Sequence, residues 1–201
     1  MEQMEPWQQR WQDEVTPWDL GKEHPLLKRI LQTAQDEGGL SSGSSIVVPG
    51  CGKGHEAAYC ERLGYTAIGL DFVPEAIEAA KSTYAESPKL SFEAADFFNW
   101  DAGEGCGAIL DRAMLCALQE KNRSRYIDKV HSSLKSGGLF MGILFGELDE
   151  SVEQGPPFRL TESDITAMFL GRFSLVSWET HSNHAKPSFI KNEFLCIWRK
   201  L

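Results

Sequence analysis

The stretch that decides the fold is residues 46–56, IVVPGCGKGHE, followed by residues 68–71, IGLD. An apolar run, a glycine turn and a helix start precede a second apolar run that ends in an acid, an order typical of a strand–helix–strand unit. Glycines at alternate positions allow positive φ and let a ligand approach where a Cβ would collide. At the tip of the second strand, Asp71 can accept from both ribose hydroxyls of a nucleoside cofactor.

Three glycine patterns compete for this turn. A phosphate-binding P-loop needs G-x-x-x-x-G-K-[ST], but Lys53 is followed by Gly54 and the glycine spacing is wrong. A dinucleotide turn needs G-x-G-x-x-G, and after Gly50 and Gly52 its third glycine position holds His55. The remaining pattern, G-x-G-x-G with an acid about twenty residues on, is similar to that of S-adenosylmethionine-dependent methyltransferases. This favours S-adenosylmethionine, with a nicotinamide or flavin cofactor and an ordinary glycine-rich turn as alternatives.

Residues 92–98, FEAADFF, contain the end of a predicted third strand, where a polar residue is followed by an aromatic one. In methyltransferases the residues after this strand meet the adenine: a carboxylate, here Asp96, accepts from the exocyclic amine, and the next residue, Phe97, borders the base. By itself, an Asp after a strand more often caps a turn or a helix. Both interpretations stay open.

The rest of the chain alternates between strands and helices, which predicts a doubly wound α/β fold with a mostly parallel sheet and helices on both faces. Two final β runs joined by a loop predict an antiparallel edge hairpin and a total of seven strands. A turn at Gly137-Gly138 is expected before the fifth strand. Expected strands are residues 45–49, 65–70, 89–94, 107–111, 138–145, 173–178 and 189–198; expected helices are residues 54–63, 74–84, 122–134 and near 161–170.

The 201 residues predict a single domain over residues 1–201, with residues 1–40 as an N-terminal helical segment and residues 45–201 as the core. No apolar run is long enough to span a bilayer, and no secretion signal is visible at the start. A net charge of −9 without a basic run disfavours nucleic acid and favours a small-molecule acceptor. We expect a cytoplasmic monomer without a membrane partner.

The five cysteines are scattered without C-x-x-C spacing and read as free thiols. Cys51 lies inside the glycine turn, but no base is evident that would make it a nucleophile. His181 and His184 are three residues apart and lack a third ligand nearby, so we expect surface histidines and no metal site.

Several segments together resemble the thiopurine S-methyltransferase family, which includes the halide and thiol methyltransferases of plants. The resemblance covers most of the chain and is poor over the last forty or so residues. The matching residues are Trp7, Trp11 and residues 16–18 (TPW), 49–54 (PGCGKG), 69–71 (GLD), 95–97 (ADF), 110–112 (LDR) and 155–158 (GPPF).

The resemblance implies a class I, Rossmann-like methyltransferase whose N-terminal segment folds over the cofactor as a lid. This lid would carry Trp7, Trp11 and Trp18. An aromatic face near the sulfonium of S-adenosylmethionine contributes roughly 0.5–2 kcal/mol. The alternative is that the tryptophans only anchor an amphipathic helix on the core. With these residues, the expected cofactor-binding set is Trp7, Trp11, Trp18, Gly50, Gly52, Asp71, Asp96, Phe97 and Arg112.

Arg112 follows the fourth strand, at the sheet edge where open α/β folds bind ligands. In the family an arginine here borders both cofactor and acceptor, so Arg112 is the expected catalytic residue. The plant halide enzymes tend to have an aromatic residue there, so Arg112 favours a thiol or thiopurine acceptor. The alternative is a structural salt bridge with Asp111. Trp18 and Phe158 are the expected walls of the acceptor pocket.

The expected reaction transfers a methyl group from S-adenosylmethionine to a soft nucleophile, most often sulfur. A thiol attacks as its thiolate, and aromatic thiols ionise readily near neutral pH, so no strong base is required. Halide, thiocyanate, hydrogen sulfide or a selenium species is an alternative acceptor. A catalytically silent S-adenosylmethionine-binding protein and a nicotinamide dehydrogenase are rival functions.

Overall fold

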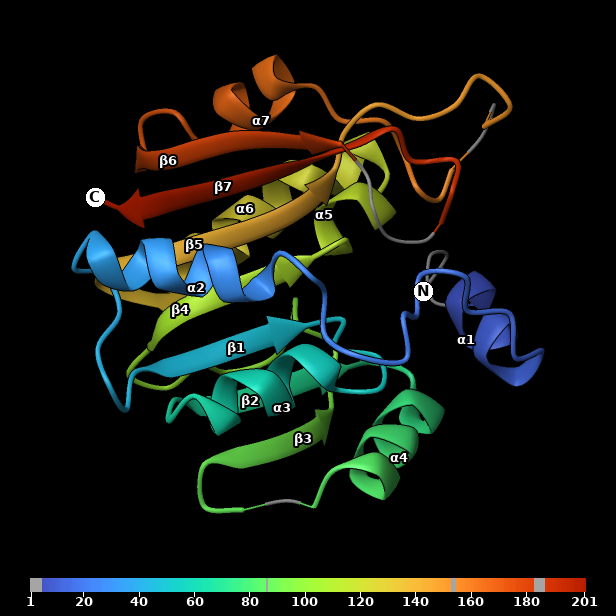
Figure 1. Ribbon diagram of the computed structural model, residues 1–201, viewed down its shortest axis with the longest axis horizontal. Coiled ribbons are helices and arrows are strands. Elements are labelled where there is room, and N and C mark those ends of the chain that lie inside the picture. The colour runs from blue at the N-terminus through green and yellow to red at the C-terminus, as the bar shows by residue number, and fades with distance from the viewer. Residues whose placement is uncertain (1–4, 86, 153–154, 183–186) are drawn as a thin grey trace.

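The computed structural model describes residues 5–85, 87–152, 155–182 and 187–201. Seven strands and seven helices lie in these ranges (Figure 1). In chain order they are α1 (Glu5–Gln12), α2 (Leu27–Asp36), β1 (Ser45–Pro49), α3 (His55–Arg62), β2 (Thr66–Asp71), α4 (Pro74–Thr83), β3 (Leu90–Ala94), β4 (Cys106–Arg112), α5 (Met114–Ala117), α6 (Glu120–Ser133), β5 (Leu134–Phe145), α7 (Glu162–Phe169), β6 (Phe173–Ser182) and β7 (Asn192–Lys200).

The seven strands form one sheet in the order β3-β2-β1-β4-β5-β7-β6. Strands β1 to β5 pair in parallel, whereas β7 runs antiparallel to both β5 and β6. The expected doubly wound, mostly parallel sheet with an antiparallel edge hairpin is confirmed. The chain winds outward from β1 to β3 and then returns to place β4 beside β1. This reversal is the switch point at which open sheets bind ligands.

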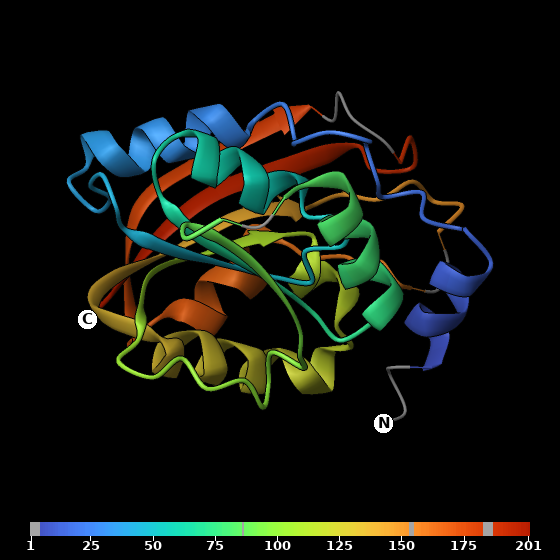
Figure 2. The same ribbon diagram turned by 90° about the horizontal axis from the view of Figure 1, so that it is seen from below.

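Helices cover both faces of the sheet, as Figure 2 shows. The helices α2, α3 and α4 lie on one side, and α5, α6 and α7 lie on the other. The central strands are therefore apolar on both faces, which is why β1 reads as a continuous hydrophobic run. Within β1, Ile46 and Val48 belong to the core layer under α2 and α3, while Val47 belongs to the layer under α6.

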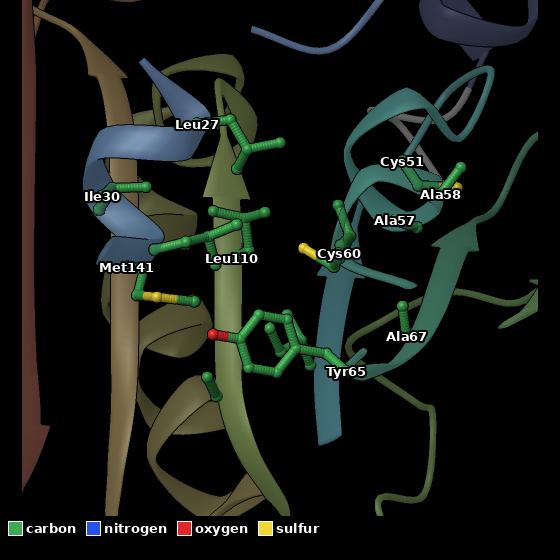
Figure 3. Close-up of a cluster of buried hydrophobic side chains, with 14 of the residues drawn as sticks. Leu27, Ile30, Cys51, Ala57, Ala58, Cys60, Tyr65, Ala67, Leu110 and Met141 are labelled. Carbon is green, nitrogen blue, oxygen red and sulfur yellow. The ribbon is translucent and has the colours of Figure 1, made fainter. Parts of the chain in front are cut away.

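The first core layer contains both small and large buried side chains (Figure 3). Leu27 and Ile30 of α2 point toward Met141 and Leu110 on the sheet, and Tyr65 lies beside them. All five side chains are at most 1% exposed. This packing keeps the strands rigid, so the loops at their carboxyl ends are held in fixed positions.

Two local features differ from the sequence expectation. The fifth strand begins at Leu134 rather than residue 138, because Leu134 already pairs with Cys106 before Leu139 pairs with Ala108. The extra residues form a bulge around Gly137, at φ +72°, instead of a turn ahead of the strand. The short helix α5 was not predicted. Its first N–H groups donate to the side chain of Asp111, which satisfies the helix start.

The N-terminal helix α1 lies beyond the carboxyl ends of the parallel strands (Figure 1). No helix in the described ranges is long and apolar enough to cross a membrane.

Candidate active site

A cavity of about 720 Å³ opens at the carboxyl edge of the sheet, between the strand tips and the N-terminal segment. It brings together all nine residues that the sequence predicts to bind the cofactor. The lining residues are Trp7, Arg10, Trp11, Pro17, Trp18, Gly50, Gly52, Asp71, Phe72, Val73, Ala95, Asp96, Phe97, Phe98, Arg112, Ala113, Met114, Cys116, Ala117, Leu118, Lys121, Asn122, Arg125, Phe145, Ser151, Val152, Pro156, Pro157, Pro187 and Phe189.

The glycine turn forms one wall of this cavity. Gly50 and Gly52 have φ of +64° and +53°, a conformation that L side chains rarely adopt. A Cβ on Gly50 would lie 3.1 Å from the sulfur of Met114, and one on Gly52 would lie 3.6 Å from the ring of Trp11. The turn therefore presents backbone atoms to the cavity, with no side chain of Gly50 or Gly52 in between.

Asp71 lies at the tip of β2 and is only 8% exposed. Its carboxylate accepts hydrogen bonds from the backbone N–H groups of Gly52 and Val73, at 3.0 Å each. Burial raises the pKa of Asp71 to about 6, although these N–H donors act in the opposite direction. A carboxylate can accept about four hydrogen bonds, so Asp71 keeps acceptor capacity for a ligand.

Asp96 and Phe97 follow β3 and line the same cavity. One oxygen of Asp96 accepts from the backbone N–H of Phe98 at 3.0 Å, and the other accepts from the side chain of Asn99 at 2.7 Å. The turn-capping interpretation of Asp96 is thus observed. The adenine contact of Asp96 and Phe97 stays a prediction.

The N-terminal segment presents an aromatic surface to the cavity. The rings of Trp7 and Trp18 meet edge to face, with centroids 5.1 Å apart. The guanidinium of Arg10 lies 5.3 Å from the ring centroid of Trp7 and 5.9 Å from that of Trp18. Trp7 and Trp11 share one face of α1, as their spacing predicts, and Trp11 reaches the glycine turn.

Three polar contacts tie this segment to the core at Trp18 and Asp19. The Nη1 atom of Arg112 donates to the backbone oxygen of Trp18 at 2.6 Å. The next residue, Asp19, forms ion pairs with Lys53 at 2.6 Å and with His55 at 3.2 Å. Burial acts to raise the pKa of Asp19, but the hydrogen bond from Lys53 and the backbone N–H of Gly21 lower it overall. His55 thus contacts the N-terminal segment through Asp19.

Arg112 does not pair with Asp111, so that alternative is wrong. Asp111 is fully buried and accepts from the N–H groups of Met114 and Leu115 and from the hydroxyl of Tyr126. Burial raises the pKa of Asp111 to about 6. Arg112 instead points into the cavity near the ring of Phe145. Its Nε and Nη2 atoms are buried and have no hydrogen-bond partner among the described residues.

Phe158 is the one predicted site residue that does not line the cavity. Its ring packs over Gly155, where a Cβ would lie 2.5 Å from the ring, and its N–H donates to the backbone oxygen of Cys116 at 2.7 Å. Pro156 and Pro157 form the wall in its place.

The remaining sequence candidates lie elsewhere or are unreactive. Cys51 is buried, and burial raises the pKa of its thiol well above the usual value, so its thiolate is disfavoured. His181 pairs with Glu179 at 2.8 Å, and His184 lies outside the described residues.

Sequence reasoning missed three cationic side chains that line the cavity: Arg10, Lys121 and Arg125. Lys121 and Arg125 are four residues apart in α6, a spacing that places them on one face, although the predicted helix begins only at residue 122. That spacing was the available signal, but nothing in it indicates that this face meets the strand tips.

Comparison with known proteins identifies the family. The model of the family Thiopurine S-methyltransferase (TPMT) matches residues 2–194. The chain belongs to this family. It is therefore an S-adenosylmethionine-dependent methyltransferase, and the expected cofactor is confirmed.

The relatives of the thiopurine S-methyltransferase family include plant and bacterial proteins. The chain is 30% identical to Thiocyanate methyltransferase 1 of Arabidopsis thaliana, over 97% of this chain and 84% of that protein. It is 28% identical to Thiopurine S-methyltransferase of Bordetella petrii, over 85% and 83%.

Solved structures share the fold at lower identity. The structure reported as "Conversion of a Disulfide Bond into a Thioacetal Group during Echinomycin Biosynthesis" has a TM-score of 0.77 at 18% identity, over 98% of this chain and 92% of that chain. N-methyltransferase NodS from Bradyrhizobium japonicum WM9, in complex with S-adenosyl-L-homocysteine, has a TM-score of 0.68 at 18% identity, over 87% and 85%. At this identity the likeness shows the class I methyltransferase fold.

Proposed function

We propose that this methyltransferase acts on the sulfur of a small organic thiol, which binds as its thiolate. The observation that carries the proposal is Arg112, which lines the cavity and whose buried Nε and Nη2 atoms have no hydrogen-bond partner in the described part of the chain. A buried donor without a partner costs about 1–3 kcal/mol, so such a pair marks a place for an acceptor, here an anion.

The residues around the cavity fit S-adenosylmethionine. The bare backbone of Gly50 and Gly52 would face its methionine moiety, and Asp71 would accept from its ribose hydroxyls. Asp96 and Phe97 would border the adenine. When bound, the cofactor supplies an electrophilic methyl group, and the protein contributes position and exclusion of water.

The tryptophans supply the other half of the cofactor site in this proposal. Trp7, Trp11 and Trp18 of the N-terminal segment line the cavity and would act as the lid. Their negative ring faces favour a cation such as a sulfonium. Arg112 holds the backbone of Trp18 at 2.6 Å, so one side chain positions the lid and faces the acceptor.

The acceptor must arrive already ionised. The described residues that line the cavity include no histidine, and their carboxylates are Asp71 and Asp96. Both carboxylates already bind backbone N–H groups. A thiol needs no base, because its ionised form is the nucleophile and the Arg112 charge stabilises that form. The sulfur of an aromatic thiol therefore fits this site better than a neutral hydroxyl or amine.

A second candidate acceptor is a small inorganic anion such as thiocyanate. The same Arg112 charge would attract it, and relatives of 30–31% identity are named thiocyanate methyltransferases. A volatile methyl product in headspace gas, formed from thiocyanate or iodide, would favour this candidate.

The oligomeric state, the location and the type of substrate of the enzyme are also proposals. We infer that it acts as a monomer in the cytoplasm on a small molecule rather than on nucleic acid. All five cysteines are free and buried, as expected in a reducing compartment. The net charge of −9 opposes approach to nucleic acid.

Transfer of a labelled methyl group to a panel of acceptors tests the proposal. We expect rapid labelling of thiophenol-type acceptors and a rate that rises with pH up to the pKa of each thiol. Binding of S-adenosylhomocysteine without labelling of any thiol or anion would instead indicate a catalytically silent binding protein.

A further inference from the structure

The order of the strands divides the cavity into two halves. Gly50, Asp71 and Asp96 lie at the carboxyl ends of β1, β2 and β3 and would hold the cofactor. Arg112 and Phe145 end β4 and β5, which lie on the other side of β1 in the sheet, so they line the half proposed for the acceptor. A residue that fixes the walls of this second half therefore determines which acceptors fit.

One wall of the acceptor half is an irregular loop. Pro156 and Pro157 line the cavity and belong to the segment between β5 and α7, where they lie in neither a helix nor a strand. Proline has no N–H group, so neither residue can donate a backbone hydrogen bond that would hold the loop. The position of this wall therefore depends on contacts made by the residues next to it.

Two contacts join this wall to α5, the short helix that lines the same cavity. The N–H of Phe158 donates to the backbone oxygen of Cys116 at 2.7 Å. The guanidinium of Arg123 makes the other contact: Nε donates to the backbone oxygen of Leu118 at 3.2 Å, and Nη2 donates to that of Arg159 at 3.3 Å. Arg123 thus connects the end of α5 to the chain that directly follows the wall.

The properties of Arg123 suit it to this connection. It lies on α6 and is only 8% exposed, although a buried cation is costly unless its donors are satisfied. A guanidinium presents its donors in a rigid planar fork, so it can hold two carbonyl oxygens at a set separation. Arg123 is not among the residues that line the cavity. Any effect of Arg123 on the reaction must therefore act through the wall.

We propose that Arg123 is a positioning residue that holds the wall of Pro156 and Pro157 against α5 and so limits the size of the acceptor. The inference rests on the proposed sulfur acceptor and deepens it. Without Arg123 the wall loses one of its two contacts to α5 and can move outward. Bulky acceptors then gain relative to small ones, while small acceptors lose the fixed position that methyl transfer requires.

Two thiols of different size test the inference: thiophenol and 4-tert-butylthiophenol. The alkyl group changes the acidity of the thiol little, so the two acceptors differ mainly in bulk. The measured quantity is the ratio of kcat/KM for the bulky thiol to kcat/KM for thiophenol. This ratio does not depend on the fraction of enzyme that is folded, so a loss of stability alone leaves it unchanged.

The variant Arg123→Gln should raise this ratio roughly tenfold, because the fit of one methylene in a pocket is worth about 10- to 200-fold in kcat/KM. Arg123→Lys keeps the buried charge but lacks the fork, so it should raise the ratio by a smaller factor. The matched control Leu31→Ala destabilises the core under α2, on the opposite face of the sheet, and should keep the wild-type ratio. Calorimetric affinity for S-adenosylhomocysteine shows that each variant is folded.

A double-variant cycle tests whether Arg123 acts through the wall. Pro157→Ala trims the wall itself and should also raise the ratio. The combined variant Arg123→Gln, Pro157→Ala should then show less than the product of the two single effects, because both changes disturb the same wall. A combined effect equal to that product would show that Arg123 acts elsewhere and would overturn the inference.

A ratio within about twofold of the wild-type value in both Arg123 variants would also overturn the inference and leave the thiol acceptor intact. Labelling of neither thiol by the wild-type enzyme, with S-adenosylhomocysteine still bound, would overturn the proposed function and this inference with it. Since Arg123→Lys retains the buried charge, misfolding of the Gln variant does not remove the test.

Discussion

Replacement of Arg112 by Met should lower the activity of the enzyme strongly and change its stability little. Methionine has a similar reach and no charge, so it fills the space beside Phe145 without the guanidinium. The substitution removes one hydrogen bond, from Nη1 to the backbone oxygen of Trp18 at 2.6 Å. It also removes two buried N–H groups that have no partner in the described structure.

In the ligand-free protein, loss of the hydrogen bond to Trp18 and removal of the unpartnered donors change the free energy of unfolding in opposite directions. A hydrogen bond involving a charged group contributes about 1.5–3 kcal/mol, and each unpartnered buried donor costs about 1–3 kcal/mol. We therefore expect the free energy of unfolding to fall by less than about 1 kcal/mol, or to rise. The activity should fall much more, because the substitution also removes the contacts of Arg112 to an anionic acceptor. About 2.7 kcal/mol of lost transition-state stabilisation corresponds to roughly a hundredfold drop in kcat/KM.

Urea unfolding, methyl transfer to an aromatic thiol and calorimetry with S-adenosylhomocysteine measure the three quantities. We expect the dissociation constant of S-adenosylhomocysteine to change by less than about threefold, since Arg112 faces the acceptor. Arg159→Met is the matched control, because Arg159 is exposed and lies outside the cavity. A loss of cofactor affinity as large as the loss of kcat/KM would show that Arg112 is a cofactor clamp. Destabilisation beyond about 3 kcal/mol would show a structural role.

Three further predictions concern the glycine turn, the tryptophans and Asp71. Gly54→Ala should destabilise the protein by about 2–4 kcal/mol in urea unfolding, because φ is +78° and the new Cβ would lie 2.4 Å from the ring of Phe92. Gly43→Ala, at φ +82° in open space, should cost only about 1–2 kcal/mol, and equal costs would refute the packing argument. Trp11→Ala should weaken the binding of S-adenosylmethionine by about 2- to 30-fold and that of S-adenosylhomocysteine much less, because only the former carries a sulfonium; calorimetry that finds equal losses would contradict the lid. For Asp71, whose pKa is about 6, the ionised form is the better ribose acceptor, so affinity for S-adenosylhomocysteine should fall up to tenfold per pH unit below pH 6. Asp71→Asn should bind more weakly at pH 8 and lose this dependence, and a wild-type profile that stays flat from pH 4.5 to 7 would exclude the role.

The parts of the fold that follow local rules could be predicted from the sequence. The strand at 45–49 and the helix that begins at Pro74 agree with the structure, because burial on both faces demands an apolar run and proline suits a first turn. The glycine turn and Asp71 were also found, because positive φ and an acid at a strand tip each require particular residues. These constraints act within about ten residues of one another along the chain or across one strand pair.

The parts that the sequence did not reveal depend on contacts between distant segments. The short helix α5 exists because Asp111 turns its side chain toward Met114 and Leu115 rather than toward Arg112. No periodicity indicates that choice. In the same way, Arg125 reaches the cavity because α6 packs behind the strand tips, next to Phe98. Phe158 failed as a wall residue because its backbone binds Cys116 and its ring turns over Gly155.

The most direct test of the account is the crystal structure of the protein with S-adenosylhomocysteine. We expect the ribose hydroxyls within hydrogen-bond distance of the Asp71 carboxylate and the homocysteine moiety against Gly50 and Gly52. The sulfur should lie between the glycine turn and the tryptophans, with Arg112 exposed to the remaining space. Density for the ligand elsewhere on the protein, or a ribose that does not contact Asp71, would contradict the account.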